Sequence, residues 1–333
     1  MYNKILGCLL GAAAGDAMGA ATETRNRKQI EEYFGGYVRD FLTPPPDTFA
    51  RGSRAGQVTD DFSLAYVTLK EVLKAGKLDE ETAVSALLKW SEVPEYFDRF
   101  AGPTTRTKVM ELKGQTPANG AFVPVNDNNK ATNGAAMKTA PIALLSKGNI
   151  DDAIEKTMVV CKITHDNNIA LAGAGAIAAA TAAAMQDGAN LYDVVQASIY
   201  GARKGDEIGR KIAHTLAGAC METRIRWAVS IALNATSLDQ AIDEISDYIG
   251  SGLMAVEAVP AAIGLCVAAG GKTVDGICAA VNIGNDTDTV ATMVGGILGA
   301  LNGVESMPDS YMEVIECENK FGLAELAKGI AEF

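Results

Sequence analysis

Apolar and small residues recur at helical spacing through most of this chain, and runs that alternate apolar with polar residues are nearly absent. Good helix formers fill these runs, which is typical of helices rather than strands. The pattern predicts helices over 64–73, 81–90, 150–161, 169–185, 192–200, 225–233, 238–248, 256–268 and 274–281, with a polar loop over 114–133. Aromatic residues make up only 6% of the chain, a low value for a sheet protein. We therefore expect an all-α fold.

Glycine recurs every fourth residue in two apolar runs. The two sets are Gly7, Gly11, Gly15 and Gly19, and Gly295, Gly299 and Gly303. On a helix, each set lies roughly along one face and leaves a shallow groove, so a second helix can approach closely. A membrane interpretation of the first run is disfavoured because Asp16 interrupts it. We predict two tightly crossed helices in a compact core, and one domain over residues 1–333, since no shift in composition marks a boundary.

The chain has 333 residues, enough to bury a large core, and a formal net charge of −12. An acidic surface repels phosphate backbones and anionic lipids, so nucleic acid and membrane are poor candidates as partners. The first residues lack the basic start and long apolar stretch of a signal peptide. The run over 169–185 is rich in Ala and Gly, which are too weakly hydrophobic to hold a helix in a bilayer. These features favour a cytoplasmic protein.

Cysteine and histidine limit the metal chemistry that is open to this chain. None of the six cysteines forms a CxxC pair and several lie in apolar helical runs, so we predict buried free thiols in a reducing compartment. Only two histidines exist, His165 and His214, which excludes a His-rich metal site and disfavours the usual zinc site.

Two short acidic segments match in kind. Thr59-Asp60-Asp61 precedes the apolar run 62–73, and Gly284-Asn285-Asp286-Thr287-Asp288-Thr289 precedes the apolar run 290–301. Helix capping alone can explain each, because Thr59 can cap a helix and carboxylates are favourable in a first turn. If the two helix starts meet, however, four carboxylates converge and would repel one another without cations. Asp and Thr oxygens would favour Mg²⁺ or Mn²⁺, with Ca²⁺ possible, and Asp286 and Asp288 would point the same way in an extended stretch.

Three further segments are weaker candidates. Asp16 lies in the first glycine run, where a buried acid needs hydrogen-bond donors, and Glu23 follows that run. Small residues over 132–137 place a loop–helix junction where backbone N–H groups could bind phosphate. His165 adjoins Asp166, an arrangement that is more often structural than catalytic.

In this order the segments resemble the ADP-ribosylglycohydrolases, a family that includes the dinitrogenase reductase-activating glycohydrolase and the ADP-ribosyl-acceptor hydrolases. The motifs are Gly11-Ala12-Ala13-Ala14-Gly15-Asp16-Ala17-Met18-Gly19 with Glu23, Thr59-Asp60-Asp61, Gly102-Pro103-Thr104-Thr105, Thr132-Asn133-Gly134-Ala135-Ala136-Met137, Thr164-His165 and the segment 284–289. Each motif is weak alone, but their order and the long spacing between the two acidic segments are specific. The resemblance implies an orthogonal, all-α single domain with a centre of two Mg²⁺ or Mn²⁺ ions.

The resemblance also implies a role for each matching residue. The metal ligands would be Thr59, Asp60, Asp61, Asp286, Asp288 and Thr289. The catalytic residues would be Glu23, Asp60, Asp61 and Asp288, with Glu23 the best candidate to manage the proton when a ribosyl bond is hydrolysed. The segment Asn133-Gly134-Ala135 would face a substrate phosphate, and His165 would line the pocket.

Two positions differ from the pattern of the family. They leave the expected metal ligands unchanged, but they leave the identity of the substrate undecided. Thr132 stands where some members have an aromatic residue that stacks on adenine, and Phe100 stands where some have an Asp. Three functions follow. The first is a hydrolase that releases ADP-ribose from a protein or small acceptor, and the second is a hydrolase of a smaller riboside, a nucleoside or N-glycoside, on the same metal centre. The third is a non-enzymatic, crystallin-like relative, against which the intact acidic set argues.

Overall fold

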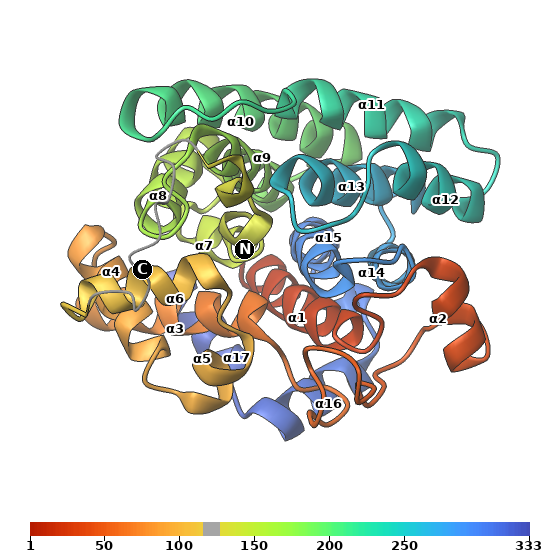
Figure 1. Ribbon diagram of the computed structural model, residues 1–333, viewed down its shortest axis with the longest axis horizontal. Helices are drawn as coiled ribbons and strands as arrows, with labels where there is room; N and C mark the ends of the chain where they lie inside the picture. Colours follow the sequence, from red (N-terminus) through yellow and green to blue (C-terminus); the bar gives the residue numbers. More distant parts are fainter. Residues whose placement is uncertain (116–126) are drawn as a thin grey trace.

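The computed structural model describes residues 1–115 and 127–333, and the regular structure of these residues is helical (Figure 1). The helices are α1 (Tyr2–Gly19), α2 (Arg27–Phe34), α3 (Asp60–Ala75), α4 (Glu80–Trp90), α5 (Pro94–Phe100), α6 (Pro103–Leu112), α7 (Thr139–Ala143), α8 (Ile150–Lys162), α9 (Asn168–Met185), α10 (Leu191–Ile212), α11 (Met221–Asn234), α12 (Leu238–Tyr248), α13 (Ala255–Ala268), α14 (Thr273–Val281), α15 (Thr287–Asn302), α16 (Asp309–Asn319) and α17 (Leu323–Glu332), with short 3₁₀ turns η1 (Asn128–Lys130), η2 (Asn133–Ala135), η3 (Leu144–Ser146) and η4 (Val304–Ser306). Within the described ranges, β-pairing is limited to isolated bridges. The all-α prediction is confirmed.

The helices surround a central group formed by α1, α15, α9 and α13. α15 packs against α1, α14, α13 and α9, so it lies at the middle of the core. Figure 1 shows α10, α11 and α12 along one side of the molecule, α3 to α6 at another and α2 at the periphery. The largest apolar cluster contains side chains from both α1 and α17. The compact helical bundle is as expected, and the assignment of one domain to the whole chain stays a prediction.

The two predicted glycine faces meet, on α1 and α15. Gly7 lies against Gly299 and Gly11 against Gly295, so the helices run antiparallel. A Cβ atom added to Gly11 would lie 2.1 Å from the carbonyl oxygen of Gly295, and one added to Gly295 would lie 2.0 Å from that of Gly11. The close approach is confirmed, but it continues along successive turns rather than at one crossing point. We call the contact of Gly7, Gly11, Gly15 and Gly19 with α15 the glycine seam.

A second close pair, α9 with α10, was not predicted. A Cβ atom on Gly201 would lie 2.1 Å from the carbonyl oxygen of Gly175, and Gly205 and Gly209 also face the backbone of α9. The predicted helix 192–200 was too short, since α10 continues to Ile212. Gly201, Gly205 and Gly209 lie in that extension and have a weak preference for helix, but close packing on α9 outweighs this preference.

The helices that the pattern missed are mostly short or polar. α2 buries only Ile30, and α5 has no fully buried residue, so neither leaves a clear apolar period in the sequence. α9 was predicted, and it is the described helix that is long and apolar enough to cross a membrane, but other parts of the protein bury it completely. It is therefore a core helix here.

The prediction for cysteine needs a correction. All six thiols are free, and Cys8, Cys161, Cys266 and Cys278 are buried as expected. Cys220 and Cys317 are exposed, because Cys220 is the N-cap residue of α11 and Cys317 lies on the outer face of α16. The predicted polar loop over 114–133 falls partly outside the described residues.

Candidate metal centre

The glycine seam brings the two acidic segments together. It ends where α1 stops and α15 starts, and a Cβ atom on Gly19 would lie 2.4 Å from the Cα atom of Asp288. Asp16, one turn earlier in α1, accepts hydrogen bonds from the backbone N–H of Thr59 (2.8 Å) and of Phe62 (2.9 Å). These donors belong to the start of α3. One helix therefore fixes the starts of α3 and α15 at the same place.

Asp16 itself is a structural acid. It is fully buried, and its two oxygens are taken by the backbone donors of α3. Burial raises the pKa of its carboxyl to about 7, against the opposing effect of those hydrogen bonds. The interpretation of Asp16 as a buried acid bonded to backbone donors is confirmed.

Glu23 is held against the second acidic segment by a short backbone pairing. The N–H of Thr24 donates to the carbonyl of Asn285 (2.8 Å), and the N–H of Asn285 donates to the carbonyl of Arg25 (2.8 Å). Thr24 and Asn285 both adopt left-handed backbone conformations, with φ of 68° and 65°. Such conformations are costly for residues other than glycine, so the surrounding contacts must hold them. The pairing places Glu23 beside Asp286.

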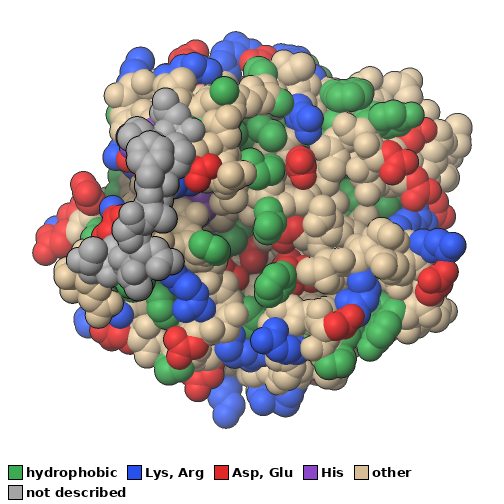
Figure 2. Space-filling model, viewed as in Figure 1, with side chains coloured by type: hydrophobic (Ala, Val, Ile, Leu, Met, Phe, Trp, Pro, Cys, Tyr) green, Lys and Arg blue, Asp and Glu red, His purple; other side chains and the backbone are tan. Residues whose placement is uncertain are grey.

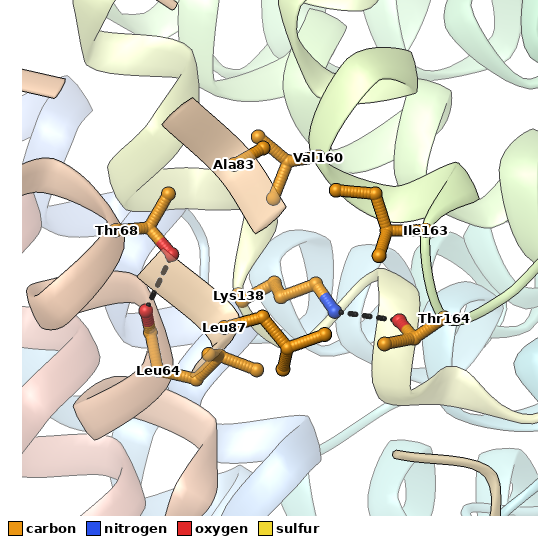
Figure 3. A pocket seen from close by; sticks show the side chains of 8 residues that line it. All are labelled: Leu64, Thr68, Ala83, Leu87, Lys138, Val160, Ile163 and Thr164. Atoms are coloured by element: carbon orange, nitrogen blue, oxygen red, sulfur yellow. Dashed lines mark hydrogen bonds between the residues drawn. The ribbon is translucent and has the colours of Figure 1, made fainter. Parts of the chain in front are cut away.

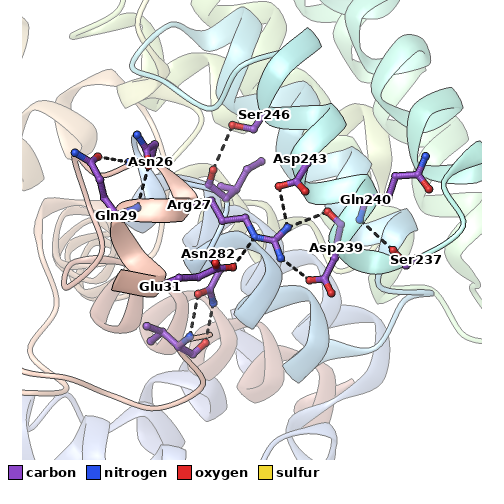
Figure 4. Close-up of polar contacts among 12 residues, drawn as sticks. Asn26, Arg27, Gln29, Glu31, Ser237, Asp239, Gln240, Asp243, Ser246 and Asn282 are labelled. Atoms are coloured by element: carbon purple, nitrogen blue, oxygen red, sulfur yellow. Dashed lines mark hydrogen bonds and ion pairs between the residues drawn. The ribbon is translucent and has the colours of Figure 1, made fainter. Parts of the chain in front are cut away.

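Polar contacts anchor the segment that follows Glu23 (Figure 4). Asn26 caps α2 and exchanges hydrogen bonds with Gln29. Arg27 forms ion pairs with Asp239 (2.6 Å) and Asp243 (2.9 Å) of α12. These contacts connect α2 to α12, more than 200 residues later in the sequence, and they fix the path of the chain as it leaves the site.

Five carboxylates, which we call the acidic cluster, converge at the two helix starts: Glu23, Asp60, Asp61, Asp286 and Asp288. Carboxylate oxygens of Glu23, Asp286 and Asp288 lie within 4.8 Å of one another. Asp61 and Asp288 are nearly fully buried, whereas Asp60 is half-buried. Figure 2 shows acidic side chains at the bottom of a hollow near the middle of one face of the molecule.

Burial and mutual repulsion raise the pKa values of the cluster. The pKa of Glu23 rises to about 8 through burial and the charges of Asp286, Asp60 and Asp16. The pKa of Asp60 rises to about 7, mainly through burial and then through Asp16. Burial is also the first cause of the raised pKa values of Asp61 and Asp288. The protein thus holds negative charges together at a free-energy cost that a cation would remove.

The donors fit divalent cations. They are carboxylate oxygens with the hydroxyl groups of Thr59 and Thr289, and hard oxygens of this kind suit Mg²⁺ and Mn²⁺. The Oδ1 atom of Asp61 is buried without a hydrogen-bond partner among the described residues. A buried carboxylate oxygen is normally satisfied, so this atom points to a missing positive partner.

The start of α3 shows the expected capping, whereas the side chain of Asp286 at the start of α15 makes no capping hydrogen bond. Thr59 is the N-cap residue of α3, and its hydroxyl accepts from the N–H of Asp61 (3.4 Å) and donates to the carboxylate of Asp61 (3.3 Å). The extended stretch expected over Asp286 and Asp288 is wrong, because Asp286 is the N-cap position of α15 and Asp288 is in its first turn. Their carboxylates still meet, since both residues flank the same helix start.

The segment Asn133-Gly134-Ala135 forms η2 beside the acidic cluster. The amide of Asn133 donates to the Oδ2 atom of Asp286 (2.6 Å), so this segment is tied directly to an expected metal ligand. Gly134 lies over His165, and a Cβ atom there would be 2.7 Å from the Cε1 and Nε2 atoms of the ring. Ala135 is fully buried, and its carbonyl oxygen accepts from the hydroxyl of Thr139 (2.9 Å) and the thiol of Cys161 (3.2 Å), so Ala135 itself presents no free group to a substrate.

The sequence analysis missed Lys138 as a residue of this region. Lys138 is 2% exposed, and its charge acts on Asp60 and Asp61. Burial lowers its pKa, while the nearby acids raise it. The sequence did carry a signal for this residue, namely a single lysine inside the largely apolar run 135–140. Lysine is rarely buried without a partner, so its place in this run pointed to nearby acids.

Comparisons with known proteins give a consistent result. The family model described as ADP-ribosylglycohydrolase matches residues 1–332. An Escherichia coli protein, "Uncharacterized protein YegU", is 30% identical, with 99% of this chain and 97% of the relative covered. "ADP-ribosylarginine hydrolase Tri1" of Pseudomonas putida is 27% identical (94% and 74% covered), and human "ADP-ribosylhydrolase ARH3" is 24% identical (94% and 89% covered). A solved "ADP-ribosylglycohydrolase-related protein complex" has the same fold, with a TM-score of 0.70 at 22% identity over 99% of this chain and 98% of that one.

Proposed function

The chain belongs to the ADP-ribosylglycohydrolase family, whose members are glycosidases, and on that premise we propose that it hydrolyses the ribosyl bond of an ADP-ribosylated protein or small acceptor. The observation that carries the proposal is the acidic cluster, in which oxygens of Glu23, Asp286 and Asp288 approach within 4.8 Å. Such a costly arrangement argues for a functional site rather than a purely structural role. Two divalent cations complete the proposed site.

We assign the cations to the two helix starts. The proposed ligands are Thr59, Asp60, Asp61, Asp286, Asp288 and Thr289. When bound, divalent cations would offset the carboxylate charge and polarise the ribose hydroxyls and a water molecule. Asn133 orients Asp286 through its 2.6 Å hydrogen bond, and Asp16 holds α3 so that its first turn faces α15.

Glu23 is the residue that we assign to proton transfer. It precedes α2 and belongs to neither of the two helix starts, and among the described residues no hydrogen bond fixes its carboxylate. It is 8% exposed and lies beside Asp286 and Asp288. Burial and these neighbours raise its pKa to about 8, so in the protein without cations the carboxyl holds a proton near neutral pH. Asp60, Asp61 and Asp288 would stabilise positive charge that develops on the ribose.

A smaller riboside is the second candidate substrate, and one observation favours it. Thr132 offers no ring on which adenine could stack. The aromatic residues Tyr96 and Phe97 pack on the cluster around Trp90, and the Phe97 ring lies 5.8 Å from the Trp90 ring. The names of the relatives Tri1 and ARH3 favour the ADP-ribosyl substrate, which we retain as the first choice.

A release assay tests both candidates. The protein would be incubated with Mg²⁺ or Mn²⁺ and a panel of ADP-ribosylated peptides, ADP-ribose derivatives and simple ribosides, and then with a chelator. We expect release that depends on the cation, and a loss of release in Asp60→Ala and Asp288→Ala. Asp275→Ala is the matched control, since Asp275 also lies in a first helix turn but outside the cluster. Full activity in the chelator, or cation binding by both cluster variants that equals the parent's in elemental analysis, would contradict the proposal.

A further inference from the structure

A chain of polar side chains leads from the buried lysine to the edge of the candidate site. The ammonium of Lys138 donates to the Oγ1 atom of Thr164 (3.3 Å), across a pocket whose other walls are mainly apolar (Figure 3). The Oγ1 atom of Thr164 lies 2.8 Å from the Nδ1 atom of His165, and the Nε2 atom of His165 lies 3.0 Å from the Oγ1 atom of Thr132. Lys138, Thr164 and His165 are buried, whereas Thr132 is partly exposed.

The positions of the protons determine which group donates and which accepts in each of these hydrogen bonds. The charged ammonium of Lys138 has no lone pair and only donates, so the hydroxyl of Thr164 accepts from it and keeps its own proton for another partner. Within the described part of the chain, the Nδ1 atom of His165 is the one acceptor within reach of that proton. The neutral ring must then carry its proton on Nε2 and donate it to Thr132. The opposite tautomer would leave the buried hydroxyl proton of Thr164 without an acceptor among the described residues, and such orphaned groups are rare.

Burial keeps the ring of His165 neutral. The imidazole is 3% exposed, and burial together with the charge of Lys138 lowers its pKa to about 3. One ring nitrogen is therefore an acceptor and the other a donor at all ordinary pH values. Protonation of the ring therefore cannot reverse the direction of donation along these hydrogen bonds.

Thr132 stands at the end of this chain and beside the acidic cluster. It is the N-cap position of η2, but its side chain forms no capping hydrogen bond. Its neighbour Asn133 donates to Asp286. Because the Thr132 hydroxyl already accepts from His165, its own proton is free for a group that enters from the solvent side.

We propose that Thr132 is a specificity-determining residue whose hydroxyl donates a hydrogen bond to an acceptor oxygen of the substrate, and that Lys138, through Thr164 and His165, is the residue that positions it. The identification of the ligand as the substrate rests on the proposed function, whereas the direction of the chain does not. The acceptor oxygen belongs either to a phosphate or to the ribose, and a comparison of two substrates separates these sources.

The direction of the chain can be measured without any substrate. The protein has two histidines, so His214→Asn leaves His165 as the only ring in a long-range ¹H–¹⁵N spectrum. The side chain of His214 is exposed, so this change should leave the fold intact. We expect one neutral tautomer with the proton on Nε2 between pH 5 and pH 8 (about two units above the pKa of about 3 at the lower limit). Lys138→Met and Thr164→Val should give mixed tautomers, and Lys138→Arg, which keeps a buried cation, should restore the single form. A parent ring with its proton on Nδ1 would overturn the proposal, and this outcome is independent of enzymatic activity.

The role of the Thr132 hydroxyl is tested by a matched pair of variants. Thr132→Val keeps the shape and removes the hydroxyl, whereas Thr132→Ser keeps the hydroxyl. We expect kcat/KM to fall about five- to tenfold for Val and to change little for Ser, as for the loss of one hydrogen bond. A loss confined to the ADP-ribosyl substrate assigns the acceptor to a phosphate, and an equal loss on a simple riboside assigns it to the ribose. Parental kcat/KM in Thr132→Val on both substrates, or an equal loss in the Ser variant, would overturn the proposal.

Discussion

The glycine seam and the acidic cluster are built on the same two helices, and they obey opposite rules. In the seam the backbones of α1 and α15 touch, and Gly11 and Gly295 leave no room for even one added carbon atom. At the end of the seam, carboxylates crowd together, and the Oδ1 atom of Asp61 has no partner among the described residues. Close packing stabilises the native state, whereas the crowded charges destabilise it until a cation binds.

The difference teaches how the fold can hold an unfavourable site in place. A flexible contact would let the carboxylates separate, but a seam of backbone atoms cannot yield in the way that the end of a long side chain can. Substitutions in the two regions should therefore change the free energy of unfolding in opposite directions. The predictions below test this contrast, beginning with the largest expected effect.

The largest effect is expected from Gly11→Ala in the seam. The new Cβ atom would meet the carbonyl oxygen of Gly295 at 2.1 Å, so the two helices must move apart. We expect the free energy of unfolding to fall by more than about 3 kcal/mol, as in the severe cases of overpacking. Urea denaturation would measure it, with Gly102→Ala as the control, because nothing lies within 4 Å of a Cβ atom there. Equal stability of the two variants would show that the helices can separate at little cost.

Asp288→Asn in the acidic cluster should separate stability from activity. Removal of one charge should lower kcat/KM for the ribosyl substrate at least a hundredfold, about 2.7 kcal/mol. The same change should raise the free energy of unfolding of the protein without cations by about 1 kcal/mol, because it relieves repulsion from Glu23, Asp61 and Asp286. Asp275→Asn provides the control. If Asp288→Asn lowered both quantities, the idea of a strained cluster would be wrong.

The pH dependence of stability offers the third test. Glu23 and Asp60 have pKa values of about 8 and about 7 in the folded protein, above their usual values, so the folded state binds more protons than the unfolded state. Their contribution to the free energy of unfolding is complete at pH values below their pKa values in the unfolded protein. It is lost as the pH rises through their pKa values in the folded protein. Thermal denaturation without cations should therefore show a loss of about 2 kcal/mol between pH 7 and pH 9. Gly102→Ala should keep this slope, Asp288→Asn should reduce it, and a flat profile in the parent would count against raised pKa values.

The smallest effect is expected from the cation itself. At a free concentration of about ten times its Kd, Mg²⁺ should stabilise the native protein by about 1.4 kcal/mol. A chelator should lower Tm and added Mg²⁺ should restore it. The shift should disappear in Asp288→Asn and persist in Gly102→Ala. A parent protein shown to have carried metal, yet with the same Tm after chelation, would contradict the clustering of ligands.

The seam and the cluster differ also in how far the sequence predicts them. The spacing of Gly7, Gly11 and Gly295 shows a close-packed face directly, because four-residue periodicity is a local property of a helix. The chemistry of Asp60 and Asp286 likewise suggests a cation site. The sequence predicted that the two glycine faces pack together, but the residues alone left open whether the two acidic segments meet, since a carboxylate carries no record of its neighbours.

Residues that act through long-range contacts were the hardest to predict. Glu23 is placed beside Asp286 by the backbone pairing of Thr24 with Asn285. Thr24 and Asn285 adopt left-handed backbone conformations that could not be predicted from the sequence. The clamp of Asp16 on α3 is a contact over more than 40 residues. Such features depend on tertiary packing, which overrides local preference.

The pairing of α1 with α15 also has a consequence for the order in which the protein is made. Gly11 is synthesised 284 residues before Gly295, the difference of their positions. At about 5–20 residues per second, the first helix must wait roughly 15–60 s for its partner to leave the ribosome. During that interval an apolar, small-residue surface has nothing to cover it and is open to wrong partners. The N-terminal helix of this protein should therefore need protection by chaperones until α15 has been synthesised.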